Sequence, residues 1–574
     1  MLKIKRIYPI AIWLFVICLL IYSRFVNLGW GLPYPMHPDE RNMAVAIQQL
    51  DCNLQPKTYN LQPCFNPHFF AYGQFPLYAA YLQILAQKAL NGTLAVPISF
   101  NEAVISLRLI SAIASILNFF VIFKIIKLLI NKAINSEKET NSYSITQLLI
   151  TSLLIIFSPF FIQFSHFGTT ESLLMLLYSL VVYLSLRKIQ NKILSTNYLL
   201  LTSLICGLAV ATKLSSILFL AVPALVLIDK SFSKKHIFAI FKLIAFTLVF
   251  SIIFSPHNFI SFADFLGSIR YESDVALGNY KAFYTRQFEN TIPFLFQFNK
   301  IFPYVLGLPI FIFSLLGFAL LSWKNKGINI LRLAALIYFL PNAFFYAKWT
   351  RFVSPILPLL LLFAILFLNV ILNLFQDLIM RFRIKSGMTK TFSRLTLCTL
   401  ISALLLPGLA YLAIYQNPDV RFTASDWIYK NIPNNSYILS ETANVVDIPF
   451  QTSNTQHLTS NYQYVSFDFY HLVENPDLQN QLSDHLAKAE YIFVPSRRLF
   501  KNNIEMYPAL KEYYRKLYSG ELGFQKVAEF SSYPTFKFQI SNFKFQMELP
   551  DEDAEETWTV FDHPVIRIYK RTSS

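Results

Sequence analysis

The sequence predicts a mainly α protein: a polytopic membrane helical bundle of about eleven spans followed by a C-terminal α+β domain. Three observations predict this fold. Of the 574 residues, 54% are hydrophobic and only 14% are charged, whereas soluble globular domains carry roughly 25% charged residues. The mean hydropathy is +0.43. Eleven runs along the chain are apolar over most of the ~20 residues that a bilayer span needs.

The expected spans cover about 8–25, 104–130, 146–162, 170–186, 197–212, 214–229, 237–255, 301–322, 329–347, 352–375 and 395–415. The first run follows Lys3, Lys5 and Arg6, which is also typical of a secretory signal. No small-residue cleavage site follows it, so we expect a retained anchor.

The net charge of +16 is unevenly distributed. If the N-terminus is cytoplasmic, the alternate loops on that side are all basic, such as "RKIQNK", "DKSFSKKH" and "WKNKG". Lys and Arg accumulate in the cytoplasmic loops of membrane proteins. The pattern therefore predicts a multi-pass protein of the cytoplasmic (plasma) membrane whose C-terminal domain is extracytoplasmic. Because membrane topology accounts for the positive charge, the pattern also excludes nucleic acid as a partner.

Two modules are expected, a transmembrane module over 1–415 and an extracytoplasmic α+β domain over 416–574. Within the first, two long outer loops cover 26–103 and 256–300. The loop stretches "ERNMAVAIQQL" and "FPLYAAYLQILAQKAL" have helical apolar spacing. In the tail, "TASDWIYKNIP" predicts a helix, and "SYILSE", "EYIFVPS", "QKVAEFSS" and "VIRIYKR" predict strands.

The five cysteines separate into two groups. Cys18, Cys206 and Cys398 fall within spans, where a thiol usually acts as a small apolar group. Cys52 and Cys64 both lie in the first outer loop, in a compartment that permits disulfides. A bridge between them is therefore a candidate, and a zinc site is not indicated.

Asp39 and Glu40, in "MHPDERNMAVAIQQL", are the first candidates for chemistry. One interpretation is structural: Asp39 caps a helix that Pro38 introduces, and Glu40 favours the positive end of its dipole. The other is catalytic, with two carboxylates held at the outer membrane surface. The two are compatible, because a cap fixes a carboxylate in position.

Further ionisable residues on the same membrane face favour a functional site. An ionisable group within or beside a span is costly and suggests function, although each residue singly could extend its charge to the headgroups. These residues are Arg108, His166, Glu171, Lys213, Lys348 and Arg351. His37, directly before Pro38 and the acidic pair, is a further candidate.

Carboxylates and cations together at an outer bilayer surface suit sugar transfer from a polyprenyl-phosphate carrier. The lipid chain would lie in the bilayer, with its phosphate and sugar at the headgroups. A carboxylate would take the proton of an acceptor hydroxyl as it attacks the anomeric carbon, and cations would stabilise the departing phosphate. Attack opposite the phosphate would invert the anomeric configuration.

At these residues the sequence resembles the membrane-embedded GT-C glycosyltransferases. It resembles most the bacterial family-39 enzymes, such as protein O-mannosyltransferases and the aminoarabinose lipid A transferase. The matching motifs, which span nearly the full length, are "HPDE", "NPHFFAYGQFPLY", "LRLISA", "HFGTTESLL", "GLAVATK", "KWTRFVSPILPLL", "ASDWIYKNIPNNSYILSE" and "TVFDHPVIRIYKR".

The resemblance implies a mannosyltransferase-like hexosyltransferase with Asp39 as catalytic base and Glu40 in a supporting or metal-linked role. It also implies that Arg108 and Arg351 lie near the donor phosphate, with Lys213 a weaker candidate of the same kind.

One motif departs from the family pattern. Many relatives carry Asp where this chain has Glu171. This difference leaves the exact role of Glu171 open, and a place in a helix N-terminal turn explains it nearly as well. Glu171, His166 and His37 are candidates for supporting roles.

Metal use stays open. GT-C enzymes divide over a divalent ion, and His37, His166 or His257 could join the acidic pair as ligands, although a single interfacial histidine usually only forms hydrogen bonds. The lipid-linked sugar is the expected donor substrate. The acceptor, which could be a protein, a lipid or a glycan, is not indicated by the sequence.

Two other classes compete with the enzyme. A lipid or sugar transporter or flippase would also have many spans and buried charge, but transporters often show paired repeats and midplane sites. Here the charges gather at one surface and the halves are not alike. The second is a membrane scaffold presenting the tail, for which the charge cluster would have no role.

Overall fold

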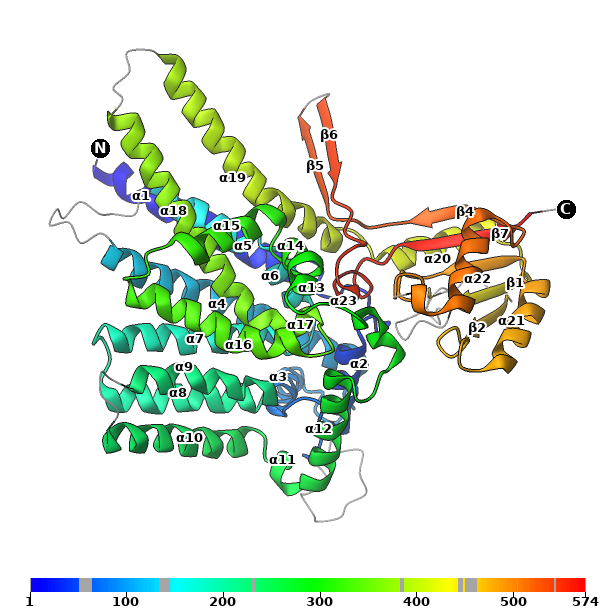
Figure 1. The fold of residues 1–574 in the computed structure, drawn as a ribbon, viewed down its shortest axis with the longest axis horizontal. Helices are drawn as coiled ribbons and strands as arrows, with labels where there is room; N and C mark the ends of the chain where they lie inside the picture. The colour runs from blue at the N-terminus through cyan, green and yellow to red at the C-terminus, as the bar shows by residue number, and fades with distance from the viewer. Residues whose placement is uncertain are drawn as a thin grey trace.

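The computed structural model describes residues 2–50, 65–133, 145–228, 233–381, 387–441, 448–449, 462–502, 504–540 and 543–572 (Figure 1). A bundle of long helices forms one part, and a sheet flanked by helices lies beyond one end of it. The bundle contains α1 (Leu2–Phe25), α4 (Phe100–Ala133), α5 (Ile145–Ile156), α6 (Pro159–His166), α7 (Glu171–Ile189), α8 (Ser195–Val210), η2 (Leu214–Leu220), α9 (Ala221–Leu227), α10 (Lys234–Phe254), α15 (Leu308–Leu320), α16 (Lys326–Phe344), α18 (Leu357–Arg381) and α19 (Gly387–Gln416).

All eleven expected spans are apolar helices, which confirms a helical membrane protein. Within the described ranges, six helices are long and apolar enough to cross a bilayer, and the bent pair α5–α6 makes a seventh. The pair bends by 47° at a short break before Pro159, because proline cannot continue the hydrogen-bond ladder of a helix. The other four expected spans correspond to shorter apolar helical stretches of 10–17 residues, at Ile10–Phe25, Ser195–Val210, Leu214–Leu227 and Leu308–Leu320.

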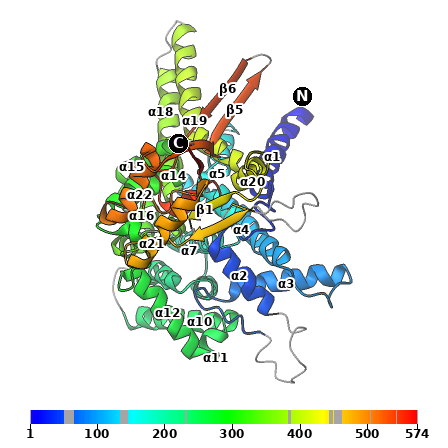
Figure 2. The same cartoon turned by 90° about the vertical axis from the view of Figure 1, so that its right-hand side faces the viewer.

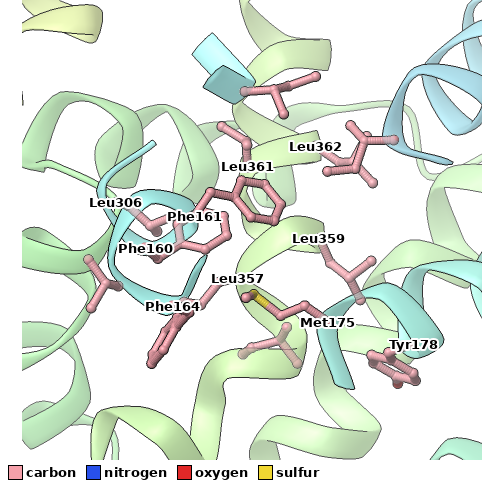
Figure 3. Close-up of a cluster of buried hydrophobic side chains, with 14 of the residues drawn as sticks. Phe160, Phe161, Phe164, Met175, Tyr178, Leu306, Leu357, Leu359, Leu361 and Leu362 are labelled. Atoms are coloured by element: carbon pink, nitrogen blue, oxygen red, sulfur yellow. The ribbon is translucent and has the colours of Figure 1, made fainter. Parts of the chain in front are cut away.

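The core of the bundle is built from aromatic and leucine side chains where α6 and α7 meet the first turns of α18 (Figure 3). This core holds α6 and the start of α18 in place. The labelled side chains are Phe160, Phe161, Phe164, Met175, Tyr178, Leu306, Leu357, Leu359, Leu361 and Leu362.

Short helices connect the bundle at the end that faces the sheet. The two loop stretches with helical spacing are α2 and α3, as predicted. The connecting helices are α2 (Pro38–Gln49), α3 (Phe75–Leu90), α11 (His257–Ile260), α12 (Phe262–Leu277), η3 (Phe283–Phe288), α13 (Leu295–Lys300), α14 (Phe302–Val305), α17 (Thr350–Val353) and η4 (Ser354–Ile356).

The C-terminal part has a five-stranded sheet of order β2-β1-β3-β7-β4. Strands β2, β1 and β3 are parallel, and β7 is antiparallel to β3 and β4. The predicted helix and all four predicted strands are present. The elements are α20 (Val420–Asn431), β1 (Tyr437–Glu441), β2 (Gln463–Phe467), α21 (Pro476–Lys488), β3 (Tyr491–Val494), η5 (Ile504–Met506), α22 (Pro508–Ser519), β4 (Phe524–Phe530), β5 (Thr535–Ile540), β6 (Phe543–Glu548), α23 (Glu556–Thr559) and β7 (Ile566–Arg571).

Helices cover both faces of this sheet. Successive residues of a strand point to opposite faces. Leu439 and Ile492 pack with the buried residues of α21 and α22, while Ile438 and Phe493 pack with those of α20. The antiparallel pair β5–β6 leaves the sheet and projects beside α19, which both views show (Figures 1 and 2).

A charged clamp fixes the chain between α23 and β7 to the bundle. Asp562 accepts hydrogen bonds from the hydroxyls of Tyr411 and Tyr415 at 2.9 and 2.7 Å, both on α19. The buried His563 ring lies between Asp562 and Asp551, with Nδ1–Oδ1 and Nε2–Oδ2 distances of 2.5 and 2.9 Å. Burial lowers the pKa of His563, but the two carboxylates raise it to about 10.

Alkaline pH is expected to weaken this clamp. Because the pKa of His563 in the folded protein exceeds its ordinary value of 6.5, its stabilising effect is complete below about pH 6.5 and is lost as the pH rises through about 10. The melting temperature in detergent should therefore fall more steeply between pH 7 and pH 10 for the wild type than for His563→Gln. Equal pH slopes in the two proteins would show that His563 does not titrate there.

Candidate active site

The acidic pair begins helix α2, but Asp39 is not its cap. The N-cap is His37, whose Nδ1 accepts the Asp39 backbone N–H at 3.2 Å, and Pro38 occupies the first helical position. The expectation that Asp39 caps the helix is wrong, because the imidazole already accepts the free N–H of the first turn. The Asp39 carboxylate is left available for other contacts.

Asp39 forms an ion pair with Arg351, which lies on α17. The side chains are 19% and 21% exposed, so the pair is accessible from a cavity. The guanidinium also lies over the Trp349 ring, 4.6 Å from its centroid. Burial raises the pKa of Asp39, but the charges of Arg351, His37 and Lys213 outweigh it and hold the pKa below the ordinary value. Asp39 is therefore ionised at neutral pH.

A cavity of about 380 Å³ lies beside this pair. Its charged lining groups are Arg351, Lys213 and Glu272, and most of the rest is apolar, including Phe265, Ile269 and other residues of α12. Burial raises the pKa of Glu272, and the positive charges of Arg351 and Lys213 offset only part of this increase. The cavity thus combines two cations with a carboxylate that protonates more readily than a free glutamate.

Lys213 is fixed by its local backbone. Lys213 lies in the turn that follows α8, and the loop before α3 packs against this turn. The Gly73 N–H of that loop donates to the Thr212 carbonyl at 2.9 Å. A side chain at Gly73 would overlap the Ala211 carbonyl, with 2.0 Å from the Cβ to the oxygen, so glycine is required for this contact. The Lys213 ammonium lies 5.2 Å from the ring centroid of Tyr72. Burial lowers the pKa of Lys213.

A much smaller cavity, about 20 Å³, is lined by Asp39 and Arg351 together with His37 and Glu171. The Glu171 side chain is buried, and its Oε1 accepts a weak hydrogen bond from Thr170 Oγ1 at 3.4 Å. The structure therefore brings together His37, Asp39, Glu171 and Arg351, with Lys213 in the larger cavity next to Arg351.

Glu40 and Arg108 are not in either cavity lining. Arg108 forms a two-pronged ion pair with Glu40, with both N–O distances at 2.7 Å, and neither side chain is more than 2% exposed. Arg108 also donates to the Leu28 and Trp30 carbonyls, and Glu40 accepts the Gly168 N–H at 2.7 Å. This pair joins α2, α4 and the turn before α7.

His166 is likewise occupied by the backbone. Its Nδ1 lies 2.7 Å from the Ile162 carbonyl and its Nε2 lies 2.9 Å from the Val26 carbonyl, while its ring stacks on Tyr415. It joins α6 to the chain after α1 and is absent from both cavity linings.

The C-terminal segment contacts the elements that form this site. Glu555 accepts hydrogen bonds from the backbone N–H and hydroxyl of Thr350 at 3.0 and 2.9 Å, directly before Arg351. The Phe561 ring lies 4.2 Å from the His37 ring, between centroids. In the sequence, "DEDAEETW" has the composition of a solvated acidic stretch, and Glu272 lies in an ordinary polar helix, so neither carried a signal.

The metal and disulfide hypotheses have different outcomes. Cys52 and Cys64 lie outside the described residues. Within the described part of the chain, no group of three or more His, Cys, Asp or Glu side chains could hold a metal ion. His257 lies apart from the acidic pair, in another cavity lining.

Comparisons with known proteins agree with the resemblance seen in the motifs. Residues 72–236 match the family model described as "Protein O-mannosyl-transferase TMEM260 N-terminal domain". The chain is similar to GT-C glycosyltransferases. No curated protein matches its sequence.

Three solved structures show distant similarity. ArnT from Cupriavidus metallidurans bound to undecaprenyl phosphate has 13% identity, a TM-score of 0.48 and 98% coverage of both chains. The archaeal oligosaccharyltransferase AglB from Archaeoglobus fulgidus, in complex with an inhibitory peptide and a dolichol-phosphate, has 12% identity and a TM-score of 0.46, with 89% of this chain and 72% of that chain covered. Arabinofuranosyltransferase AftD from Mycobacteria has 12% identity and a TM-score of 0.39, with 99% and 42% covered.

Proposed function

We propose that this protein is an inverting glycosyltransferase that moves a sugar from a polyprenyl-phosphate donor to an acceptor hydroxyl at the outer face of the cytoplasmic membrane. The observation that carries the proposal is the partly exposed ion pair of Asp39 with Arg351, because Arg351 lines the largely apolar cavity and also borders, with Asp39, the smaller one. The family match over 72–236 supports the reaction class.

Arg351 and Lys213 would bind the donor phosphate. Both are cationic and line the same cavity, whose apolar walls suit the first isoprene units of the lipid. A phosphate at Arg351 would share the guanidinium with Asp39 and weaken the ion pair. Because that pairing holds the pKa of Asp39 down, donor binding would raise the pKa and make Asp39 a better proton acceptor.

In the transfer step, Asp39 takes the proton of the acceptor hydroxyl while the oxygen of that hydroxyl forms a bond to the anomeric carbon of the sugar. The bond from this carbon to the phosphate oxygen breaks, and the polyprenyl phosphate leaves with the electron pair. Arg351 and Lys213 stabilise the charge that develops on the leaving group.

The C-terminal part, over 416–574, would cover the site. Glu555 holds Thr350, and Phe561 packs on His37, so its last segment contacts the chain on both sides of the Asp39–Arg351 pair. With the N-terminus cytoplasmic, as the basic loops indicate, this part lies outside the cell membrane.

The direct test uses purified protein in lipid nanodiscs with a panel of labelled polyprenyl-phosphate sugars and peptide, lipid and polysaccharide acceptors. We expect one donor to be consumed, with the sugar recovered on an acceptor in the inverted configuration. If no donor is consumed, but a labelled lipid crosses the bilayer of reconstituted vesicles, the protein is a flippase and the proposal is wrong.

A further inference from the structure

The β5–β6 hairpin has one apolar face that is largely exposed in the described part of the protein. Paired residues of an antiparallel hairpin lie on the same face. Phe538 pairs with Phe545 and Phe536 with Met547, while Lys537 pairs with Gln546 on the opposite face. Phe538, Phe545 and Met547 are 44%, 42% and 38% exposed.

This amphipathic pattern needs a partner. A two-stranded hairpin is marginally stable in water by itself, and adjacent exposed aromatic side chains mark a contact surface. Phe543, at the start of β6, is also exposed, at 62%. The apolar face of the hairpin (Phe536, Phe538, Phe543, Phe545 and Met547) is therefore suited to a non-aqueous environment.

The position of the hairpin indicates which environment that is. Strand β5 packs against α19, a membrane-spanning helix of which only 33% of the spanning window is buried by protein. At its base, Pro534 and Leu549 line a cavity with Leu406 and Pro407, in the half of α19 nearer the C-terminal sheet. The apolar face is thus continuous with a helix surface that faces lipid.

The hairpin also runs in a direction that suits the membrane surface. Both views show it projecting to the side of the bundle (Figures 1 and 2), and Figure 1 shows it running crosswise to α7, α8 and α10 rather than along them. Its outer backbone edges are unpaired within the described chain, which is costly in hydrocarbon but not at the headgroups. Lys537 and Lys544 lie on the polar face, where ammonium groups can reach lipid phosphates.

We propose that the β5–β6 hairpin is a lateral membrane anchor, with its apolar face in the headgroup–acyl boundary of the leaflet nearer the C-terminal sheet. Interfacial amphipathic elements bury their apolar face about 5–10 Å into this boundary. The anchor would hold the chain that leads from the sheet to α23, and so the segment that contacts Thr350 and His37. The inference does not depend on the proposed transfer reaction.

Site-directed spin labelling of the full-length protein in nanodiscs tests the proposal. Labels would be placed singly at 538 and 545 on the apolar face and, as matched controls, at 537 and 546, in a chain whose native cysteines are replaced. We expect the labels at 538 and 545 to be severalfold more accessible to oxygen than to a water-soluble nickel complex, and the reverse at 537 and 546. High nickel access on both faces would overturn the proposal.

A second measurement needs no cysteine replacement. Benzophenone-alanine at 538 or 545 in native membranes should give lipid adducts on irradiation, and severalfold fewer at 546. Protein–protein adducts at 538 would instead show that a second copy or another protein covers this face, and they would overturn the proposal, as would an absence of lipid adducts.

Discussion

Asp39→Asn is expected to reduce sugar transfer by about 10²–10⁴-fold, the contribution typical of a positioned general base. The amide cannot take the acceptor proton. It also releases Arg351 from its ion pair, so the donor should bind at least as tightly as to the wild type. Transfer of labelled sugar and equilibrium binding of the donor lipid, measured on the same preparation, check both halves.

The matched control is Asp264→Asn, an exposed aspartate in the first turn of α12. It should leave both transfer and donor binding unchanged. If Asp39→Asn still transfers sugar within a few-fold of the wild-type rate, Asp39 is not the base. A variant that loses donor binding instead would favour a role for Asp39 in the binding site itself.

Arg108→Met is expected to destabilise the protein by about 3–5 kcal/mol, the usual cost of removing one partner of a buried ion pair. The Glu40 carboxylate would remain buried, keeping only the Gly168 N–H among its present hydrogen-bond donors. Thermal unfolding in detergent should show a large fall in melting temperature. Glu40→Met/Arg108→Met should recover part of the loss, because no charge is then left buried.

Arg351→Met is the contrasting variant. Its ion pair is about one-fifth exposed, so stability should fall far less than in Arg108→Met, while donor affinity should drop. The opposite result, a stable Arg108→Met protein that binds the donor poorly, would support the phosphate-binding role that the family resemblance implies for Arg108.

Much of the architecture follows from local pattern. Long apolar runs predicted the membrane helices, because hydrocarbon requires apolar side chains and internally paired backbone. Strands β1, β3, β4 and β7 were predictable from runs of β-branched and aromatic residues. The hairpin β5–β6 was not predicted, although "TFKFQISNFKFQME" alternates, and neither were α21 and α22.

The site was predicted as a set of residues but not as a set of contacts. Asp39, Arg351 and Lys213 converge, as the clustering of charge on one membrane face indicated. Glu272 and Glu555 were missed, because an acid in a polar helix or an acidic loop has the composition of ordinary solvated chain.

Composition and local pattern are enough to establish a helical membrane protein with an acidic pair after its first apolar helix. The contacts of each acid depend on how the helices pack. Neighbouring helical residues point about 100° apart, so Glu40 turns inward to Arg108 while Asp39 turns to Arg351 at a cavity. These arginines lie 68 and 312 positions away along the chain, and no local pattern can encode such a choice.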